Sequence, residues 1–336
     1  MRGPLKSVAG LGCALVLAVT AGCSSGDGGG TDAAAPAEGS ASPSAEAVTA
    51  YAPYVNATSA DANDAAGSPS TYNLAFVISS GSGCTPSWHG SQAIDDKAAT
   101  ARIAELTESG ADVRVSFGGA SGKELAATCD SAEELARAYG AALDAAGASR
   151  ADFDIEGDEL TDSESVALRS EAIALLQKER ADLEVTYTVP VMPSGLDEDT
   201  IALLESANDH GVKVRTVNIM TMNYGESFDG DMGDYAVTAA KAAQAQLRDV
   251  FGLSEAEAWR GMALTSMIGV NDVKGETFTL EDAEQVRGFA EEKGVAWVSM
   301  WSTFRDRACE SGAEDALTEC SGVEQEEGAF GEALAG

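Results

Sequence analysis

Short β-like runs alternate with amphipathic helical stretches along most of this chain, and this alternation restricts the possible folds more than any other feature. The strand candidates are Asn73–Ser79, Val113–Phe117, Asp152–Glu156, Leu183–Val189, Val217–Asn223, Met262–Ile268 and Val295–Trp301. The helical stretches between them carry end signals, with capping-box patterns beginning at Ser131 and Thr279 and glycines at 147 and 294. Repeated strand–helix units predict a parallel sheet with helical crossovers.

The number of these units favours a closed barrel. Seven strands are clear and an eighth is expected within about 260 residues, which is the size of a (β/α)8 TIM barrel. A doubly wound open sheet is the alternative, but such nucleotide-binding sheets would be expected to show a phosphate loop. The nearest match, Gly118–Glu124, is one residue too short and has Glu124 where Ser or Thr is required. The sequence therefore predicts a TIM barrel over residues 71–333.

The N-terminal part is predicted to be a targeting segment followed by a tether. The apolar run Leu11–Ala21 is too short for a transmembrane helix, so we expect a signal peptide over residues 1–23. The run ends in VTAGC, which resembles a bacterial lipobox in which Cys23 would be lipidated; an ordinary secretory signal is the alternative. Residues 24–70 are rich in small and polar residues without apolar periodicity, and we expect a flexible linker there.

Charge and cysteine content limit the partners and the compartment. The chain has 21 basic and 55 acidic side chains, and the net charge of −34 opposes binding to nucleic acid or anionic lipid. We expect a monomer that meets the membrane only through its lipid anchor, outside the cell or secreted. The four cysteines of an exported domain predict disulfides, with Cys84–Cys129 and Cys309–Cys320 favoured among three possible pairings. Zinc is disfavoured because no C-x-x-C spacing occurs.

Three carboxylates alternate along one strand candidate, in which Asp152, Asp154 and Glu156 are separated by Phe153 and Ile155. Side chains two apart share a face, and in a barrel the last inward residue reaches the C-terminal mouth, where the active sites of this fold lie. Repulsion and partial burial would raise at least one pKa, which makes Glu156 the natural proton donor. The alternative is a divalent cation bound by the three carboxylates, but we expect the site to hold no metal.

Four motifs occur in register on successive strand candidates. They are Asp152-Phe-Asp154-Ile-Glu156, Ser116-Phe-Gly118-Gly119, Met222-Asn-Tyr224 and the terminal Trp301. Together they resemble the DxxDxDxE, SxGG, M-x-Y and last-strand tryptophan motifs of glycoside hydrolase family 18, the chitinase family, and its single-domain bacterial members in particular. The sequence departs from the family pattern at Ser149, Met220 and Gly225, where aspartate, glutamine and aspartate are usual, so the roles of those groups are not carried over.

The resemblance implies a secreted TIM-barrel chitinase that hydrolyses β-1,4 linkages in chitin or N-acetylglucosamine oligosaccharides without a cofactor. In this family the acetamido carbonyl of the substrate replaces a protein nucleophile. By the same resemblance, Glu156 is the acid and base, Asp154 orients the acetamido N–H, and Asp152 is hydrogen-bonded to Asp154. Tyr224 would donate its hydroxyl to the acetamido oxygen.

The resemblance also implies the substrate contacts. The −1 sugar would rest on Trp301 with Met222 beside it. Ser116 is a further candidate contact, although it and the glycines after it are expected mainly to permit tight packing beneath the site. Two other functions remain open: an endo-β-N-acetylglucosaminidase acting on N-glycans or cell-wall glycans, and a non-catalytic glycan-binding lipoprotein on the same barrel. The intact Glu156 argues against the second.

Overall fold

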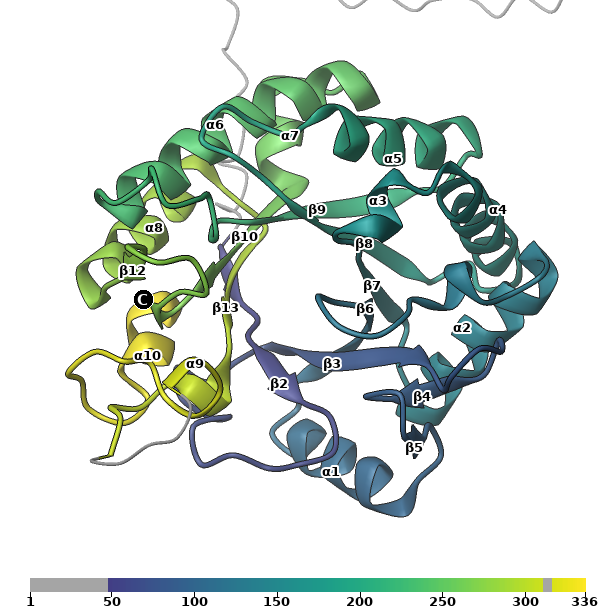
Figure 1. The fold of residues 1–336 in the computed structure, drawn as a ribbon, viewed down its shortest axis with the longest axis horizontal. Coiled ribbons are helices and arrows are strands. Elements are labelled where there is room, and N and C mark those ends of the chain that lie inside the picture. The colour runs from purple at the N-terminus through teal and green to yellow at the C-terminus, as the bar shows by residue number, and fades with distance from the viewer. Residues whose placement is uncertain (1–47, 311–315) are drawn as a thin grey trace, which may run out of the picture. The chain divides into compact units, whose positions relative to one another are not determined.

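Parallel strands close into a barrel surrounded by helices in the computed structural model, which describes residues 48–310 and 316–336 (Figure 1). The strands predicted from the sequence are all present as β3 (Thr71–Ser79), β6 (Asp112–Gly118), β7 (Arg150–Asp154), β8 (Glu184–Pro190), β9 (Val214–Met220), β10 (Met262–Met267) and β13 (Trp297–Trp301). Each is hydrogen-bonded in parallel to its neighbour in that order. The predicted TIM barrel is confirmed. The signal segment and Cys23 lie outside the described residues.

The eighth position of the barrel is filled by a segment that precedes the predicted domain. β1 (Ala50–Tyr51) pairs in parallel with β13, and β2 (Tyr54–Asn56) pairs in parallel with β3, so residues 50–56 close the ring. The prediction of a linker up to residue 70 is therefore wrong from residue 48 onward. Pro53, which cannot donate a backbone hydrogen bond, divides the strand into pieces too short to show a periodic pattern.

Helices connect successive strands on the outside of the barrel (Figure 1). The long ones are α1 (Lys97–Thr107), α2 (Ala132–Ala146), α4 (Ser163–Glu179), α5 (Glu198–Asp209), α6 (Met232–Phe251) and α8 (Leu280–Lys293). Short helices follow as α3 (Asp158–Thr161), α7 (Glu255–Arg260), α9 (Ala316–Glu319) and α10 (Ala329–Ala335). The capping box predicted at Thr279 forms, and Gly147 and Gly294 end their helices in the left-handed conformation as expected.

Two small hairpins stand on the barrel. One consists of β4 (Pro86–Trp88) and β5 (Gln92–Ala93), and the other of β11 (Gly269–Val270) and β12 (Thr277–Phe278).

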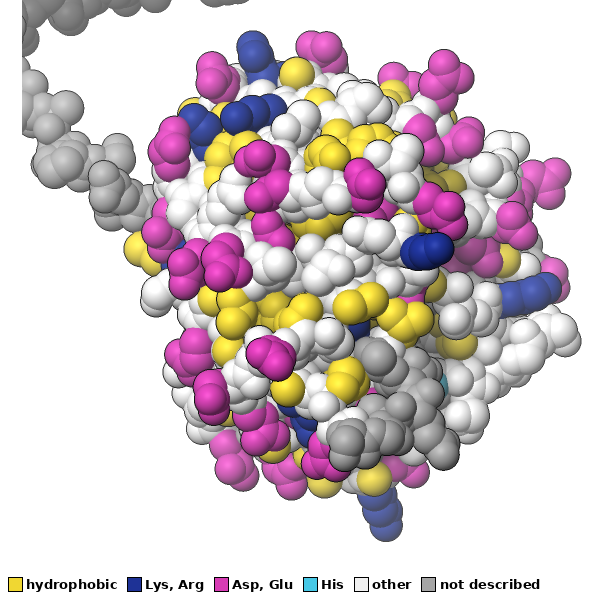
Figure 2. Space-filling view, turned by 60° about the vertical axis from the view of Figure 1, so that its left-hand side comes forward, with side chains coloured by type: hydrophobic (Ala, Val, Ile, Leu, Met, Phe, Trp, Pro, Cys, Tyr) yellow, Lys and Arg dark blue, Asp and Glu magenta, His cyan; other side chains and the backbone are white. Residues whose placement is uncertain are grey.

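The structure contains the disulfides Cys84–Cys129 and Cys309–Cys320, which is the pairing favoured from the sequence. No helix in the described part of the chain has the length and apolar character needed to span a membrane. Figure 2 shows acidic side chains scattered over one face, with fewer basic ones among them.

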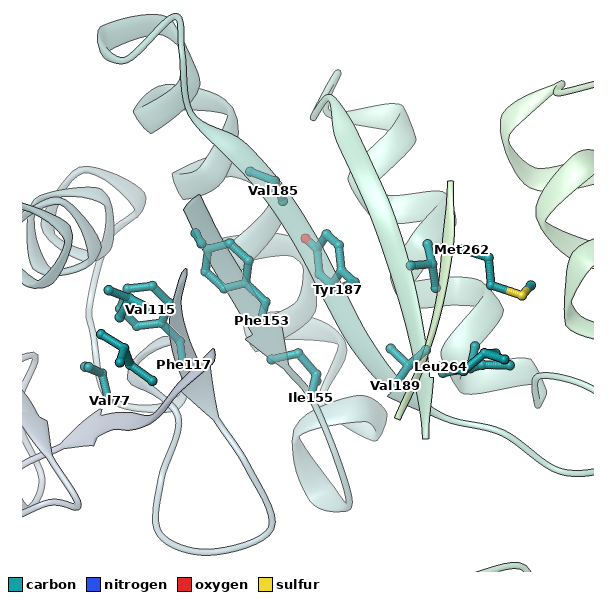
Figure 3. Packing of buried hydrophobic residues seen from close by; sticks show 14 of the residues in the cluster. Val77, Val115, Phe117, Phe153, Ile155, Val185, Tyr187, Val189, Met262 and Leu264 are labelled. Atoms are coloured by element: carbon teal, nitrogen blue, oxygen red, sulfur yellow. The ribbon is translucent and has the colours of Figure 1, made fainter. Parts of the chain in front are cut away.

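The apolar side chains of the strands pack outward against the helices. Phe153 of β7 stacks on Phe117 of β6 with ring centroids 5.4 Å apart, and Tyr139 of α2 meets both rings edge-on. Figure 3 shows Phe117, Phe153 and Tyr187 on three successive strands, facing the same layer. Side chains alternate along a strand, and Phe153 points outward to the helices. The residues on either side of Phe153 therefore point into the barrel. Those residues are Asp152 and Asp154.

Candidate active site

A cavity of about 110 Å³ lies at the carboxyl ends of the strands. Its acidic lining residues are Asp154, Glu156 and Asp272, and Trp301 and Met222 also line it. The structure therefore brings four of the predicted site residues to one place: Asp154 and Trp301 end β7 and β13, and Glu156 and Met222 follow β7 and β9 by two residues. Asp272 joins them, an aspartate that the sequence analysis did not identify. This is the end of the barrel at which the active sites of the fold occur.

Asp152 lies beneath the cavity and is fully buried. Its carboxylate accepts hydrogen bonds from the hydroxyls of Tyr54 at 2.8 Å, Ser116 at 2.6 Å and Thr188 at 2.6 Å. Burial raises the pKa of Asp152, and the hydrogen bonds from Ser116 and Thr188 oppose that increase. The expectation that Ser116 contacts the substrate is wrong, because its side chain is buried and serves to hold Asp152.

Asp154 and Glu156 are neighbouring acidic residues of the cavity whose pKa values are both raised. Burial raises the pKa of Asp154, and the neighbouring charges of Glu156 and then Asp152 raise it further. Burial also raises the pKa of Glu156 to about 6, against the lowering effect of its hydrogen bond with Asp154. A carboxyl with a pKa near 6 can both donate and accept a proton near neutral pH. Asp154 Oδ1 is buried and has no hydrogen-bond partner among the described residues. The expected hydrogen bond between Asp152 and Asp154 is not formed, because the Asp152 carboxylate bonds to Tyr54, Ser116 and Thr188 instead.

Three aromatic side chains line the same cavity as the carboxyls. The Phe76 ring of β3 stacks on Trp301 with centroids 5.4 Å apart and an interplanar angle of 22°. Tyr54 meets Trp301 edge-on at 6.0 Å. All three rings line the cavity, and the partly exposed rings of Phe76 and Trp301 could carry the apolar face of a sugar. Sequence reasoning missed Phe76 and Tyr54, and Tyr54 fell within the expected linker.

The two glycines after β6 permit close packing, as expected. A Cβ at Gly118 would lie 2.1 Å from the carbonyl oxygen of Asp154, so no side chain fits between β6 and β7 there. A Cβ at Gly119 would lie 2.9 Å from the ring of Phe76. The Gly119 N–H donates to the Asp154 carbonyl at 2.9 Å. Both glycines have positive φ, which disfavours any replacement.

We predict that Gly119→Ala lowers the free energy of unfolding by about 2–5 kcal/mol, the sum of a left-handed backbone cost and displacement of Phe76. The displaced ring should also raise KM for a sugar substrate. Urea unfolding and steady-state kinetics measure the two effects. Gly147→Ala is the matched control, because Gly147 also has positive φ but a Cβ there would meet nothing within 4 Å. Equal destabilisation by the two substitutions would contradict the role given to Phe76.

Tyr224 is not brought to the cavity with the other predicted residues. Its ring packs near Phe228 and Tyr235, with centroids 5.9 and 6.0 Å away. Its hydroxyl is buried without a partner among the described residues, and burial raises the pKa of the phenol. The preceding residue, Asn223, lines the cavity instead and donates from Nδ2 to Asp272 Oδ2 at 3.2 Å.

The three departures from the family pattern have separate structural settings. Ser149 lies before β7, where its carbonyl accepts the Glu184 N–H at 3.0 Å. Met220 lines the cavity. The Gly225 N–H donates to Glu276 Oε1 at 2.8 Å, which ties the turn after β9 to the loop between β11 and β12.

A second cavity of about 170 Å³ adjoins the first. The two share Glu156, Met220, Met222 and Asn223 as lining residues, so the Glu156 carboxyl stands between them. The second cavity adds Met192 and Asp197. A chain-like ligand could therefore extend to both sides of the proton donor. Within the described part of the chain, no group of three or more His, Cys, Asp or Glu side chains is arranged to hold a metal ion.

Curated relatives share sequence with this chain. A probable bifunctional chitinase/lysozyme of Escherichia coli (strain K12) is 34% identical over 275 residues, covering 76% of this chain and 31% of the relative. Endochitinase 11 of Metarhizium anisopliae is 33% identical over 274 residues, covering 76% of this chain and 52% of the relative. The chain thus spans about a third and about half of these proteins. No family model matches it.

Solved structures share the fold. Active domain 2 of a thermostable chitinase from Pyrococcus furiosus, whose catalytic-site mutants were complexed with chito-oligosaccharides, superposes with a TM-score of 0.76. That domain is 28% identical, and the match covers 85% of this chain and 94% of that one. A GH18 chitinase from Pseudoalteromonas aurantia superposes with a TM-score of 0.55 at 14% identity, covering 76% of this chain and 94% of that one, which reflects the fold alone.

Proposed function

From the shared sequence and fold we propose that this chain is a glycoside hydrolase of the GH18 chitinase family and that it hydrolyses β-1,4 linkages between N-acetylglucosamine units. Chitin oligosaccharides are the proposed substrate. The supporting observation is the buried, unpartnered Oδ1 of Asp154 beside a carboxyl whose pKa is raised to about 6. An acetamido N–H of the substrate would supply the missing hydrogen bond.

In the proposed first step, protonated Glu156 donates its proton to the glycosidic oxygen as the bond from that oxygen to the anomeric carbon breaks. The acetamido carbonyl oxygen of the −1 sugar forms a new bond to the same carbon and generates an oxazolinium ion. Asp154 accepts the acetamido N–H and balances the developing positive charge. The sugar rests on the Trp301 face during this step.

In the second step, ionised Glu156 removes a proton from a water molecule, and the resulting hydroxide attacks the anomeric carbon. The bond to the acetamido oxygen breaks, and Glu156 ends the cycle protonated. Two inversions at one carbon retain its configuration. Asp152, held by hydroxyls on three strands, would keep a negative charge near Asp154; burial, Glu156 and this charge together raise the pKa of Asp154.

Product analysis on N-acetylglucosamine oligomers with time-resolved detection of the anomers tests this function. We expect shorter oligomers whose first-formed reducing ends are β anomers. Products that appear first as α anomers would contradict the mechanism, and binding without any product would favour a non-catalytic glycan-binding protein. Parallel assays on high-mannose glycoproteins and on cell-wall glycans test the two other substrate classes. If one of these glycans is cleaved and the N-acetylglucosamine oligomers are not, that glycan is the substrate in place of chitin.

We further propose that the protein is exported and tethered to the membrane through lipidated Cys23. Two disulfides in the described domain support an oxidising compartment. Membrane fractionation of the Cys23→Ala variant is the test. Release of the variant into the medium is expected, and an unchanged membrane fraction would count against the anchor.

A further inference from the structure

The loop between β11 and β12 is fixed at both of its ends. The buried side-chain amide of Asn271 donates to the carbonyls of Met267 at 2.8 Å and Gly269 at 3.0 Å. At the other end the Glu276 carboxylate accepts the Gly225 N–H. The two ends are joined directly, because the Asn271 N–H donates to the Glu276 carbonyl at 3.1 Å. A side chain between these residues is therefore held in a defined place.

Asp272 occupies that place and lines the same cavity as Glu156. Its Oδ2 accepts the hydrogen bond from Asn223, which has a left-handed φ of 56°. The family pattern has an aspartate after the tyrosine of the β9 motif, where this chain has Gly225. We propose that Asp272 is a positioning residue for the proton donor, a carboxylate held beside Glu156 from the β11–β12 loop in place of the one absent at Gly225.

The electrostatic setting makes this charge effective. The acidic groups that line the two cavities around Glu156 are Asp154, Asp197 and Asp272, and Asp152 lies beneath them. No Lys, Arg or His side chain lines either cavity among the described residues. The charge of Asp272 raises the pKa of Glu156, in addition to the larger effect of burial. A negative neighbour favours the protonated acid, which is the form that donates to the leaving oxygen.

The substitution Asp272→Asn isolates the charge, because the asparagine carbonyl can still accept the bond from Asn223. This test rests on the proposed function, and kcat/KM against pH is its first measurement. Glu156 must be protonated to donate, so a lower pKa moves the basic limb of the profile to lower pH. We expect a shift of roughly half a pH unit, or about threefold lower kcat/KM on that limb. Asp272→Glu should restore the wild-type limb at least in part.

Asp229→Asn is the matched control. Asp229 is an exposed aspartate on the neighbouring loop whose Cβ would lie 3.6 Å from a Cβ at Gly275, and it lines neither cavity. The Asp229→Asn substitution removes the same charge near the same loop, and it should leave the basic limb of the pH profile unmoved. A basic limb that stays in place in Asp272→Asn, or that moves equally in Asp229→Asn, would overturn the proposal.

A second measurement separates this inference from the proposed function. Carbon-13 carboxyl titration of Glu156 by NMR, with the signal assigned by its loss in Glu156→Gln, requires no substrate. The Glu156 midpoint should fall in Asp272→Asn and stay unchanged in Asp229→Asn. If no glycan is hydrolysed by the wild type but the midpoint falls, the function fails and the positioning role stands. An unchanged midpoint refutes the role even in an active enzyme.

Discussion

Glu156→Gln should lower kcat on N-acetylglucosamine oligomers by about 10²–10⁴-fold, the usual contribution of a positioned acid or base. The amide cannot give a proton to the glycosidic oxygen, nor take one from water in the second step. KM should change little, because glutamine keeps the shape of the side chain between the two cavities. Initial rates on soluble oligomers measure the loss.

The fold should survive this substitution, since it removes a carboxyl whose pKa is raised by burial and adds no bulk. Urea unfolding checks this, and Glu159→Gln, on the short helix that follows, is a control for the loss of one nearby carboxyl. In the wild type, kcat/KM should fall as pH rises above about 6, because Glu156 loses the proton that it must donate. Normal activity in Glu156→Gln would refute the assigned proton transfers.

Asp154→Asn is expected to have the second largest effect, a loss of about 10²–10³-fold in kcat. The asparagine side chain cannot balance the positive charge of an oxazolinium ion. Its amide can also present N–H groups to the acetamido N–H, and two donors repel each other. Because the interaction strengthens as charge develops, kcat should fall more than KM rises. Steady-state kinetics on one oligomer separates the two constants.

Asp158→Asn is the matched control for this prediction, because Asp158 is an exposed aspartate on the same segment and lines neither cavity. It should keep wild-type kinetics. The mechanism would have to be abandoned if Asp154→Asn changed KM alone, since that would give Asp154 equal contacts with substrate and transition state.

The carboxylates were predictable because strand periodicity decides which face they occupy. Asp152 and Asp154 lie within β7, and alternation with Phe153 puts them inside the barrel whatever the loops do. Tyr224 lies four residues beyond the end of β9, after a left-handed residue at Asn223. Strand alternation no longer applies there, and of the two neighbours it is Asn223 that lines the cavity, while the role predicted for Tyr224 stays a prediction.

Other parts of the site depended on contacts that no local pattern reveals. Tyr54 meets Asp152 across 98 positions of sequence, and its own strand is interrupted at Pro53. Asp272 reaches the cavity only because buried side chains at either end of its loop fix that loop to the barrel. Short strands and the contacts that hold loops in place are specified by tertiary packing, so the hydrophobic periodicity of the sequence does not predict them.

The segment that closes the barrel also decides where the domain can be cut. A chain begun at residue 71 would lack residues 50–56 and leave the adjoining edges of β3 and β13 unpaired. Exposed strand edges template pairing with other chains, so such a truncated protein should associate and precipitate. A chain begun at residue 48 keeps residues 50–56 paired with β3 and β13, and it should elute as a single species in gel filtration.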